Sequence, residues 1–93
     1  MKPSAAHSAP AETVALQALG FLAAADALGR FMSVSGVDLD TIRAHAGDPE
    51  FLAAVMDFLL GDDALVLEFC AQQDLDAQAL HRLRRALPGA PPA

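Results

Sequence analysis

The pattern of hydrophobic positions is helical along most of the chain, and its most apolar run covers residues 11–25. At about 100° per residue, this run leaves only a narrow stripe free of large apolar side chains, whereas a surface helix normally shows a broad polar face. The stripe consists of Thr13, Gln17, Gly20 and Ala24. The apolar arc consists of Val14, Ala15, Leu16, Ala18, Leu19, Phe21 and Leu22. We therefore expect a central helix that other helices cover on most sides.

Start and stop signals predict five further helices, and no run alternates in the manner of a strand. The clearest start is at 48–50, where Asp48 supplies an N-cap, Pro49 suits the first helical position and Glu50 places an acid in the first turn. This helix is predicted to end before Gly61, with a polar stripe of Glu50, Ala54 and Asp57. The other predicted helices run from Asp26 to Gly36, from Asp38 to Gly47, from Asp62 or Asp63 to a break at 74–76, and from there to Pro88. Their apolar, inward residues are predicted to include Leu28, Phe31, Met32, Val34, Leu39, Ile42, Ala46, Leu65, Val66, Phe69, Cys70, Leu80, Leu83 and Leu87.

A shift of 37 residues aligns the first half of the chain with the second. Phe21 then aligns with Phe58, and the triplet Asp-Ala-Leu at 26–28 aligns with the same triplet at 63–65. The match resumes after one inserted residue. Two interpretations stay open: a pseudo-repeat of two three-helix units, or chance similarity between helices rich in alanine and leucine. The predicted fold class is all-α, a compact six-helix bundle, and the repeat adds that the first and fourth helices pack together as a central pair.

The chain of 93 residues is long enough for one small domain. We expect a single helical domain at 11–87, between a disordered N-terminal tail at 1–10 and a disordered, Pro-rich tail at 88–93. Hydrophobic residues make up 54% of the composition, which excludes a fully disordered chain. So much apolar surface in so small a domain favours a homodimer or a protein partner.

The formal net charge of −6 argues against a protein that coats nucleic acid or an anionic membrane. The single cysteine, Cys70, permits no internal disulfide and is typical of a reducing cytoplasm. The apolar run at 11–25 differs from a secretory signal, because only Lys2 precedes it and it contains Glu12 and Gln17. It is also too short to span a bilayer. We therefore expect a cytoplasmic protein.

Residues that carry chemistry are scattered, and the sequence predicts no catalytic residue, cofactor or metal site. His7, His45, His81 and Cys70 show no pair at metal-ligand spacing. A cysteine-based activity of Cys70 with His81 is a minor alternative, because it needs an exposed thiol and Cys70 lies on the apolar face of its predicted helix. The simpler interpretation is that Cys70 is a small core residue. The acidic pairs are expected to serve as helix caps: Asp38 with Asp40, and Asp62 with Asp63.

A nucleic-acid-associated regulator with helix-turn-helix-like units is the main alternative. Residues 31–43 place Gly36 in a suitable turn, but Asp38 and Asp40 would repel phosphate at the start of the reading helix. The second unit, residues 69–85, is more suitable because its last helix is basic. Its candidate interaction patch consists of His81, Arg82, Arg84 and Arg85. The same residues also complement the negative end of a helix dipole, and the net charge opposes this alternative.

Three blocks of sequence resemble the bacterial domain-of-unknown-function family 3572, whose members are small proteins found mainly in alphaproteobacteria. The blocks are ETVALQALGFLA at 12–23, GVD at 36–38 and GDPEFLAAVMDFLL at 47–60. The similarity extends over about residues 12–87. It implies a small helical cytoplasmic protein, and it implies no activity and no catalytic residue, because none is established for the family.

The function that the sequence favours is a small, non-enzymatic protein-interaction or regulatory module. This prediction rests on the apolar composition, the acidic net charge and the lack of any grouped chemical motif. A partner protein or a second copy of the chain is expected, with no membrane, nucleic acid, cofactor or small-molecule substrate.

Overall fold

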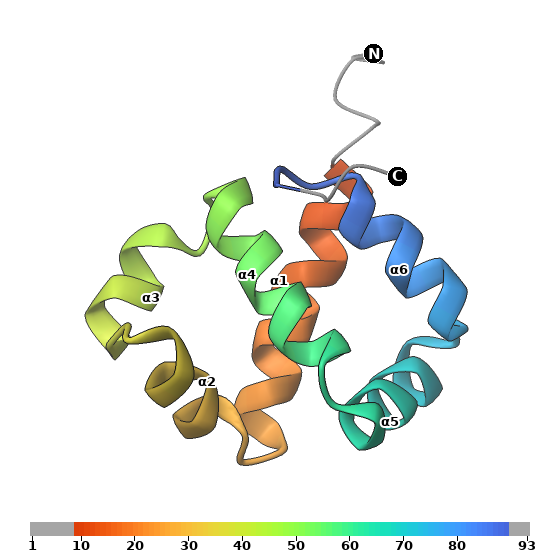
Figure 1. The fold of residues 1–93 in the computed structure, drawn as a ribbon, viewed down its shortest axis with the longest axis horizontal. Coiled ribbons are helices and arrows are strands. Elements are labelled where there is room, and N and C mark those ends of the chain that lie inside the picture. The colour runs from red at the N-terminus through yellow and green to blue at the C-terminus, as the bar shows by residue number, and fades with distance from the viewer. Residues whose placement is uncertain (1–8, 90–93) are drawn as a thin grey trace.

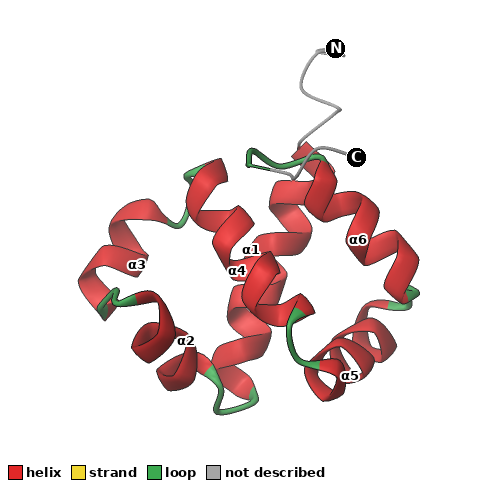
Figure 2. Ribbon diagram, viewed as in Figure 1, coloured by secondary structure: helices red, strands yellow, loops and turns green. Residues whose placement is uncertain are grey.

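The computed structural model describes residues 9–89, which form six helices and, within that range, no strand (Figures 1 and 2). The helices are α1 (Ala9–Ala24), α2 (Leu28–Ser35), α3 (Leu39–His45), α4 (Pro49–Leu60), α5 (Asp63–Gln73) and α6 (Ala77–Arg85). The predicted all-α, six-helix class is confirmed. α1 begins at Ala9 rather than at Ala11, so it takes in the last residues of the predicted N-terminal tail. The remaining parts of both predicted tails, residues 1–8 and 90–93, lie outside the described residues.

The centre of the domain is the pair α1 and α4, which pack against each other more extensively than any other two helices (Figure 1). α2 and α3 lie on one side of this pair, and α5 and α6 lie on the other. The expectation that the first and fourth helices form a central pair agrees with this arrangement. The internal repeat itself stays a prediction.

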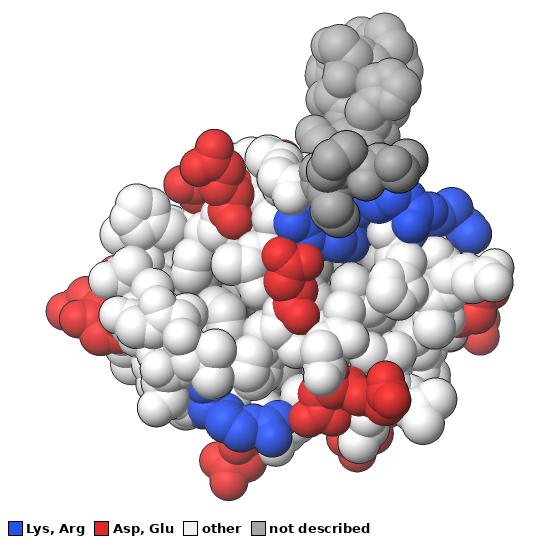
Figure 3. All heavy atoms as spheres, viewed as in Figure 1, with Lys and Arg blue, Asp and Glu red and all other residues white. Residues whose placement is uncertain are grey.

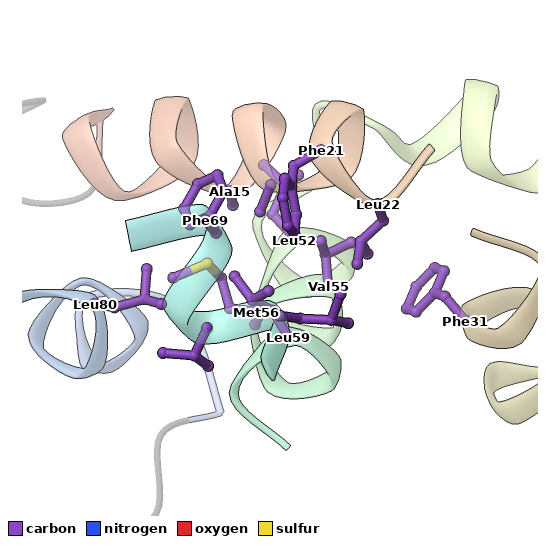
Figure 4. Close-up of a cluster of buried hydrophobic side chains, with 14 of the residues drawn as sticks. Ala15, Phe21, Leu22, Phe31, Leu52, Val55, Met56, Leu59, Phe69 and Leu80 are labelled. Carbon is purple, nitrogen blue, oxygen red and sulfur yellow. The ribbon is translucent and has the colours of Figure 1, made fainter. Parts of the chain in front are cut away.

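The core is made by helix faces that the hydrophobic pattern predicts. Phe21 of α1 meets Phe69 of α5 with ring centroids 5.3 Å apart, and Figure 4 shows both rings among the side chains of α4. The fully buried side chains of the central pair are Ala11, Ala15, Ala18, Leu22, Leu52, Val55, Met56 and Leu59. The predicted polar stripes are exposed, as expected: Thr13, Gln17, Gly20 and Ala24 on α1, and Glu50, Ala54 and Asp57 on α4.

Four helices begin at an aspartate whose carboxylate accepts a backbone N–H of the first turn, which satisfies a donor that the helix leaves unpaired. The N–H donors and distances are Thr41 to Asp38 at 2.8 Å, Glu50 to Asp48 at 3.1 Å, Leu65 to Asp62 at 3.2 Å and Ala79 to Asp76 at 2.7 Å. These contacts confirm the predicted helix starts, and they select Asp62 rather than Asp63 as the cap of α5.

The prediction that Asp26 opens the second helix is wrong. Asp26 has a φ of 63° and ends α1 in the left-handed conformation, while Ala27 precedes α2 without a side-chain cap. The Ala27 N–H bonds to the Leu22 carbonyl at 2.8 Å, and the Asp26 N–H bonds to the Ala23 carbonyl at 3.3 Å. These two bonds form a Schellman motif, in which aspartate tolerates the left-handed position that glycine usually takes.

Three residues expected inside the bundle are exposed instead. Leu39 of α3 keeps 45% of its surface accessible. Leu16 keeps 44% of its surface accessible, because the helices around α1 leave that side uncovered. Val34 keeps 75%, because α2 packs extensively only against α1 and buries only Phe31. The central helix is therefore covered less completely than predicted, and α2 presents an apolar side chain to the outside.

Candidate functional site

Three hollows adjoin the exposed stripe of α4, with volumes of about 400, 310 and 350 Å³. Asp57 lines all three, so they are neighbours along α4, and together we call them the α4 groove. Its floor is α4, one wall is α2 with the start of α5, and the other wall is the turn after α6. The lining residues are Arg30, Phe31, Val34, Ser35, Glu50, Ala53, Ala54, Asp57, Phe58, Gly61, Asp62, Arg84, Pro88 and Gly89.

An ion pair between Asp57 and Arg84 closes one side of the groove. The Arg84 Nε donates to Asp57 Oδ1 at 2.6 Å, and Arg84 Nη2 donates to Oδ2 at 3.1 Å. This two-pronged contact is the strongest arrangement available to a guanidinium and a carboxylate. The Arg84 side chain is only 9% exposed, whereas that of Asp57 is 59% exposed. The cation is therefore enclosed, and the carboxylate faces the groove.

Arg84 also fixes the turn that follows α6. Its Nη1 donates to the carbonyl oxygens of Leu87 at 3.4 Å and Pro88 at 3.1 Å, and its Nη2 donates to the Gly89 carbonyl at 3.3 Å. Gly89 has a φ of 81°, a conformation that favours glycine. One arginine therefore joins α4, α6 and the wall of the groove. Pro88 and Gly89, which the sequence analysis assigns to the C-terminal tail, are part of this wall.

The other side of the groove combines an exposed cation with an aromatic ring. Arg30 of α2 donates to Asp62 at 3.0 Å, and its guanidinium lies 5.6 Å from the centroid of the Phe58 ring. Both partners are partly exposed, so the ion pair contributes little to stability. Its effect is to hold Arg30 across the end of the groove, over a ring that is only half-buried.

An aromatic cluster forms the apolar part of the groove. Phe31 is buried and meets Phe51 and Phe58 edge-on, with centroids 5.9 and 5.5 Å away. Val34 lies next to this cluster along the same hollow and is largely exposed. Figure 3 shows basic side chains over the end of α6 and over part of α2, acidic ones over the start of α5 and at the outer edge of α3, and uncharged surface between them. The groove thus has an apolar section bordered by charged groups.

The candidate patch on α6 is divided by the fold. His81, Arg82 and Arg85 are exposed, but Arg84 is buried and its hydrogen bonds go to Asp57 and the following turn. The structure therefore removes Arg84 from any surface patch. The pairing of Arg84 with Asp57 is not among the features predicted from the sequence. The available signal was that Asp57 is one of two acids far from a predicted helix start, in an otherwise apolar helix.

Cys70 lies in the core on α5, with 7% of its surface exposed. Burial raises the pKa of its thiol, and the negative charge of Asp76 raises it further. Both effects disfavour the thiolate that nucleophilic or metal chemistry requires. Within residues 9–89, no group of three His, Cys, Asp or Glu side chains is arranged to hold a metal ion. His7 lies outside the described residues.

The sequence matches the family described as "Protein of unknown function (DUF3572)" over residues 8–90. The chain belongs to this family. The match covers the whole α4 groove, so the groove is part of the DUF3572 domain and not of an added segment. No match was found among curated proteins or among solved structures. Membership in the DUF3572 family confirms the resemblance, and it brings no activity with it.

The helices were also compared with the length and apolarity that a membrane span requires. In the part of the chain that the structure describes, no single helix of this DUF3572 protein is long and apolar enough to cross a membrane. Pro10–Ala24 and Leu28–Ser35 meet that requirement only when taken together, and they are bent by 111° at the break between them.

Proposed function

We propose that this protein is a non-enzymatic protein-interaction module whose α4 groove receives a segment of a partner protein. The observation that carries the proposal is the apolar hollow between α2 and α4, in which Val34 is exposed beside the Phe31 and Phe58 rings. An apolar section with a charged border is the usual anatomy of a protein-binding surface. The groove is open and shallow, which suits a peptide segment better than an enclosed small molecule.

Two features support a protein partner over a nucleic acid. The net charge is −6, and the groove itself is lined by the acids Glu50, Asp57 and Asp62. On α6, the hydrogen bonds of Arg84 go to other protein groups, which leaves fewer cations for phosphate. A cytoplasmic location also belongs to this proposal, because one buried thiol suits a reducing compartment.

Site-specific photo-crosslinking tests the proposal. A photoreactive residue is placed at Val34, in the groove, and in a matched chain at Leu67, which is 71% exposed on α5 and does not line the groove. We expect crosslinks in the native cell from position 34 and none from position 67. Equal crosslinking from both positions would contradict the proposal.

The mass of the crosslinked product separates a partner from a second copy. A product of twice 9.7 kDa, together with a dimer in light scattering of the purified chain, would identify the occupant as the protein itself. A heavier or lighter product that forms only in the presence of other proteins supports a separate partner. A groove-filling Ala54→Trp variant should abolish the crosslink, because Ala54 lies exposed on the floor.

A further inference from the structure

The charges along the α4 groove are unevenly available to a partner. The Arg84 guanidinium is enclosed, while the Asp57 carboxylate that it holds is 59% exposed. Glu50 lies at one end of the groove. It is exposed and has no ion-pair partner among the described residues. Arg30 is the exposed cation of the groove, and Asp62 already pairs with it. The groove therefore offers the unpaired carboxylate of Glu50 and the remaining lone pairs of Asp57, whose two oxygens each already accept from Arg84, in a chain whose net charge is −6.

The unpaired carboxylate of Glu50 and the exposed side of the Asp57 carboxylate have a helical spacing. Glu50 and Asp57 both lie on the exposed stripe of α4, and seven residues correspond to two helical turns, or about 10 Å along the axis. Ala54 lies between them and is small, so the backbone of a partner could approach closely there. Beside Ala54 opens the hollow of about 350 Å³ with Phe31, Val34 and Phe58. Asp57 and Ala54 line this apolar hollow, and Glu50 lies about one helical turn before Ala54 on the same exposed stripe.

We infer that the α4 groove binds an amphipathic helical segment of a partner protein, in which one large apolar residue lies between two Lys or Arg residues about seven positions apart. This inference rests on the proposed function above. The apolar residue enters the hollow beside Ala54, and the two cations meet Glu50 and Asp57. Helix-in-groove recognition uses apolar anchors at this kind of spacing. The charges supply orientation and a rate of association that falls with salt.

Three labelled peptides of about 15 residues, long enough to form a helix, test this chemistry against the full-length chain. The first carries a central leucine between two lysines one heptad apart, the second replaces both lysines by glutamates, and the third replaces the leucine by alanine. We expect the first to bind about tenfold more tightly than either of the others, measured by fluorescence anisotropy. Its affinity should fall as ionic strength rises. Backbone amide signals of Val34, Ala54 and Asp57 should shift in two-dimensional NMR spectra.

A pair of matched variants separates the groove from the general charge of the protein. Glu50→Lys and Glu68→Lys change the net charge equally, and both residues are exposed on helices, but only Glu50 lines the groove. We expect Glu50→Lys to weaken binding of the first peptide about tenfold and Glu68→Lys to leave it nearly unchanged. Equal weakening by both variants would overturn the inference.

The outcomes also separate this inference from the proposed function. If the glutamate peptide binds more tightly and shifts the NMR signals of the same groove residues, the inferred basic charge of the partner segment is wrong. Docking of a segment in the groove would still hold. No binding of any peptide, while crosslinks form from position 34, would likewise overturn only the inference. If no crosslink forms from position 34 either, the proposed function and the inference are both wrong. NMR shifts confined to α6 would show that the peptides bind outside the groove, and would contradict both the inference and the proposed function.

Discussion

The two flanks of the α1–α4 pair differ in how much they bury, although each consists of two short helices. On the packed flank, α5 and α6 bury Leu65, Val66, Phe69, Cys70 and Leu80. On the open flank, α2 and α3 bury only Phe31 and Ile42. α6 packs extensively against α1, α4 and α5, whereas α3 packs extensively against no other helix. Stability therefore resides mainly on the packed flank, and the open flank is free to form a wall of the α4 groove.

The largest predicted effect on stability comes from removing a large buried side chain from the packed flank. Phe69 is fully buried against Phe21, so Phe69→Ala should cost about 3–5 kcal/mol of the free energy of unfolding. That is a large share of the roughly 5–15 kcal/mol that stabilises a typical domain. Urea denaturation followed by circular dichroism measures it, because the chain has no Trp or Tyr for fluorescence.

Phe31→Ala is the counterpart on the open flank. Phe31 is also buried, but its aromatic neighbours Phe51 and Phe58 are half-buried and can close over the space. We expect a smaller loss of about 2–3 kcal/mol. A loss as large as that of Phe69→Ala would contradict the distinction between the flanks.

The next effect comes from the arginine that ties the packed flank to α4. Arg84→Ala removes a two-pronged ion pair and the bonds to the turn at 87–89, and we expect a loss of about 2 kcal/mol. The half-exposed Asp57 can return to water, which keeps the loss below that of a fully buried pair. Arg85→Ala is the control, because Arg85 is exposed, and it should change stability by less than about 0.5 kcal/mol.

Hydrogen exchange gives a second readout for Arg84→Ala. The variant should speed exchange at Leu87, whose N–H bonds to the Arg84 carbonyl at 3.0 Å, more than in α1, because the lost side-chain bonds hold this turn and none of them joins α1. Uniform acceleration across the domain would show instead that Arg84 acts through global stability alone.

The local parts of this fold follow from the sequence, because their causes are local. Each N-cap bond joins residues two or three positions apart, so an aspartate before an apolar run is a sufficient signal. Helix faces follow equally well, because burial of α1 and α4 repeats at the helical period. Asp26 was misassigned because the sequence does not distinguish an aspartate that caps the next helix from one that ends the previous helix in a left-handed turn.

The non-local parts do not follow from the sequence. Arg84 and Asp57 are separated by 27 positions, and among several basic residues of α6 only packing decides which one turns inward. The same holds for Val34, whose helical phase predicts burial and whose exposure depends on how little α3 covers α2. Both Arg84 and Val34 line the α4 groove, so this site could not be predicted from local sequence signals.

Acid should weaken both flanks through their helix caps. The Leu65 N–H lowers the pKa of Asp62 below 3.8, and Arg30 lowers it further, while the Thr41 N–H lowers the pKa of Asp38. A lowered pKa stabilises the fold above the unfolded value of 3.8, and this contribution is lost as the pH falls through the folded value. Asp62→Asn and Asp38→Asn keep a capping oxygen but cannot titrate there. Each variant should lose less stability than the wild type between about pH 6 and about pH 3 in urea denaturation.

The two caps also distinguish the flanks at neutral pH. Asp62→Asn removes an ion pair with Arg30 that joins α2 to the start of α5, whereas Asp38 forms no ion pair with another residue of the range 9–89. Because this exposed pair contributes little, Asp62→Asn should be only slightly more destabilising than Asp38→Asn, and high salt should reduce the difference. The opposite order would show that α3 depends on its cap more than the packed flank does.

The smallest predicted effects on stability come from charged substitutions at two exposed apolar side chains, one on each flank. Val34→Asp on the open flank and Leu67→Asp on the packed flank each place a carboxylate at a side chain that is more than two-thirds exposed. Both should change the free energy of unfolding by less than about 0.5 kcal/mol, because neither side chain leaves a core. Their effects on binding should differ, since only Val34 lines the apolar hollow that receives the anchor residue of a partner. A clear loss of stability in Val34→Asp alone would mean that Val34 is covered in solution. The open flank would then bury its apolar side chains as the packed flank does.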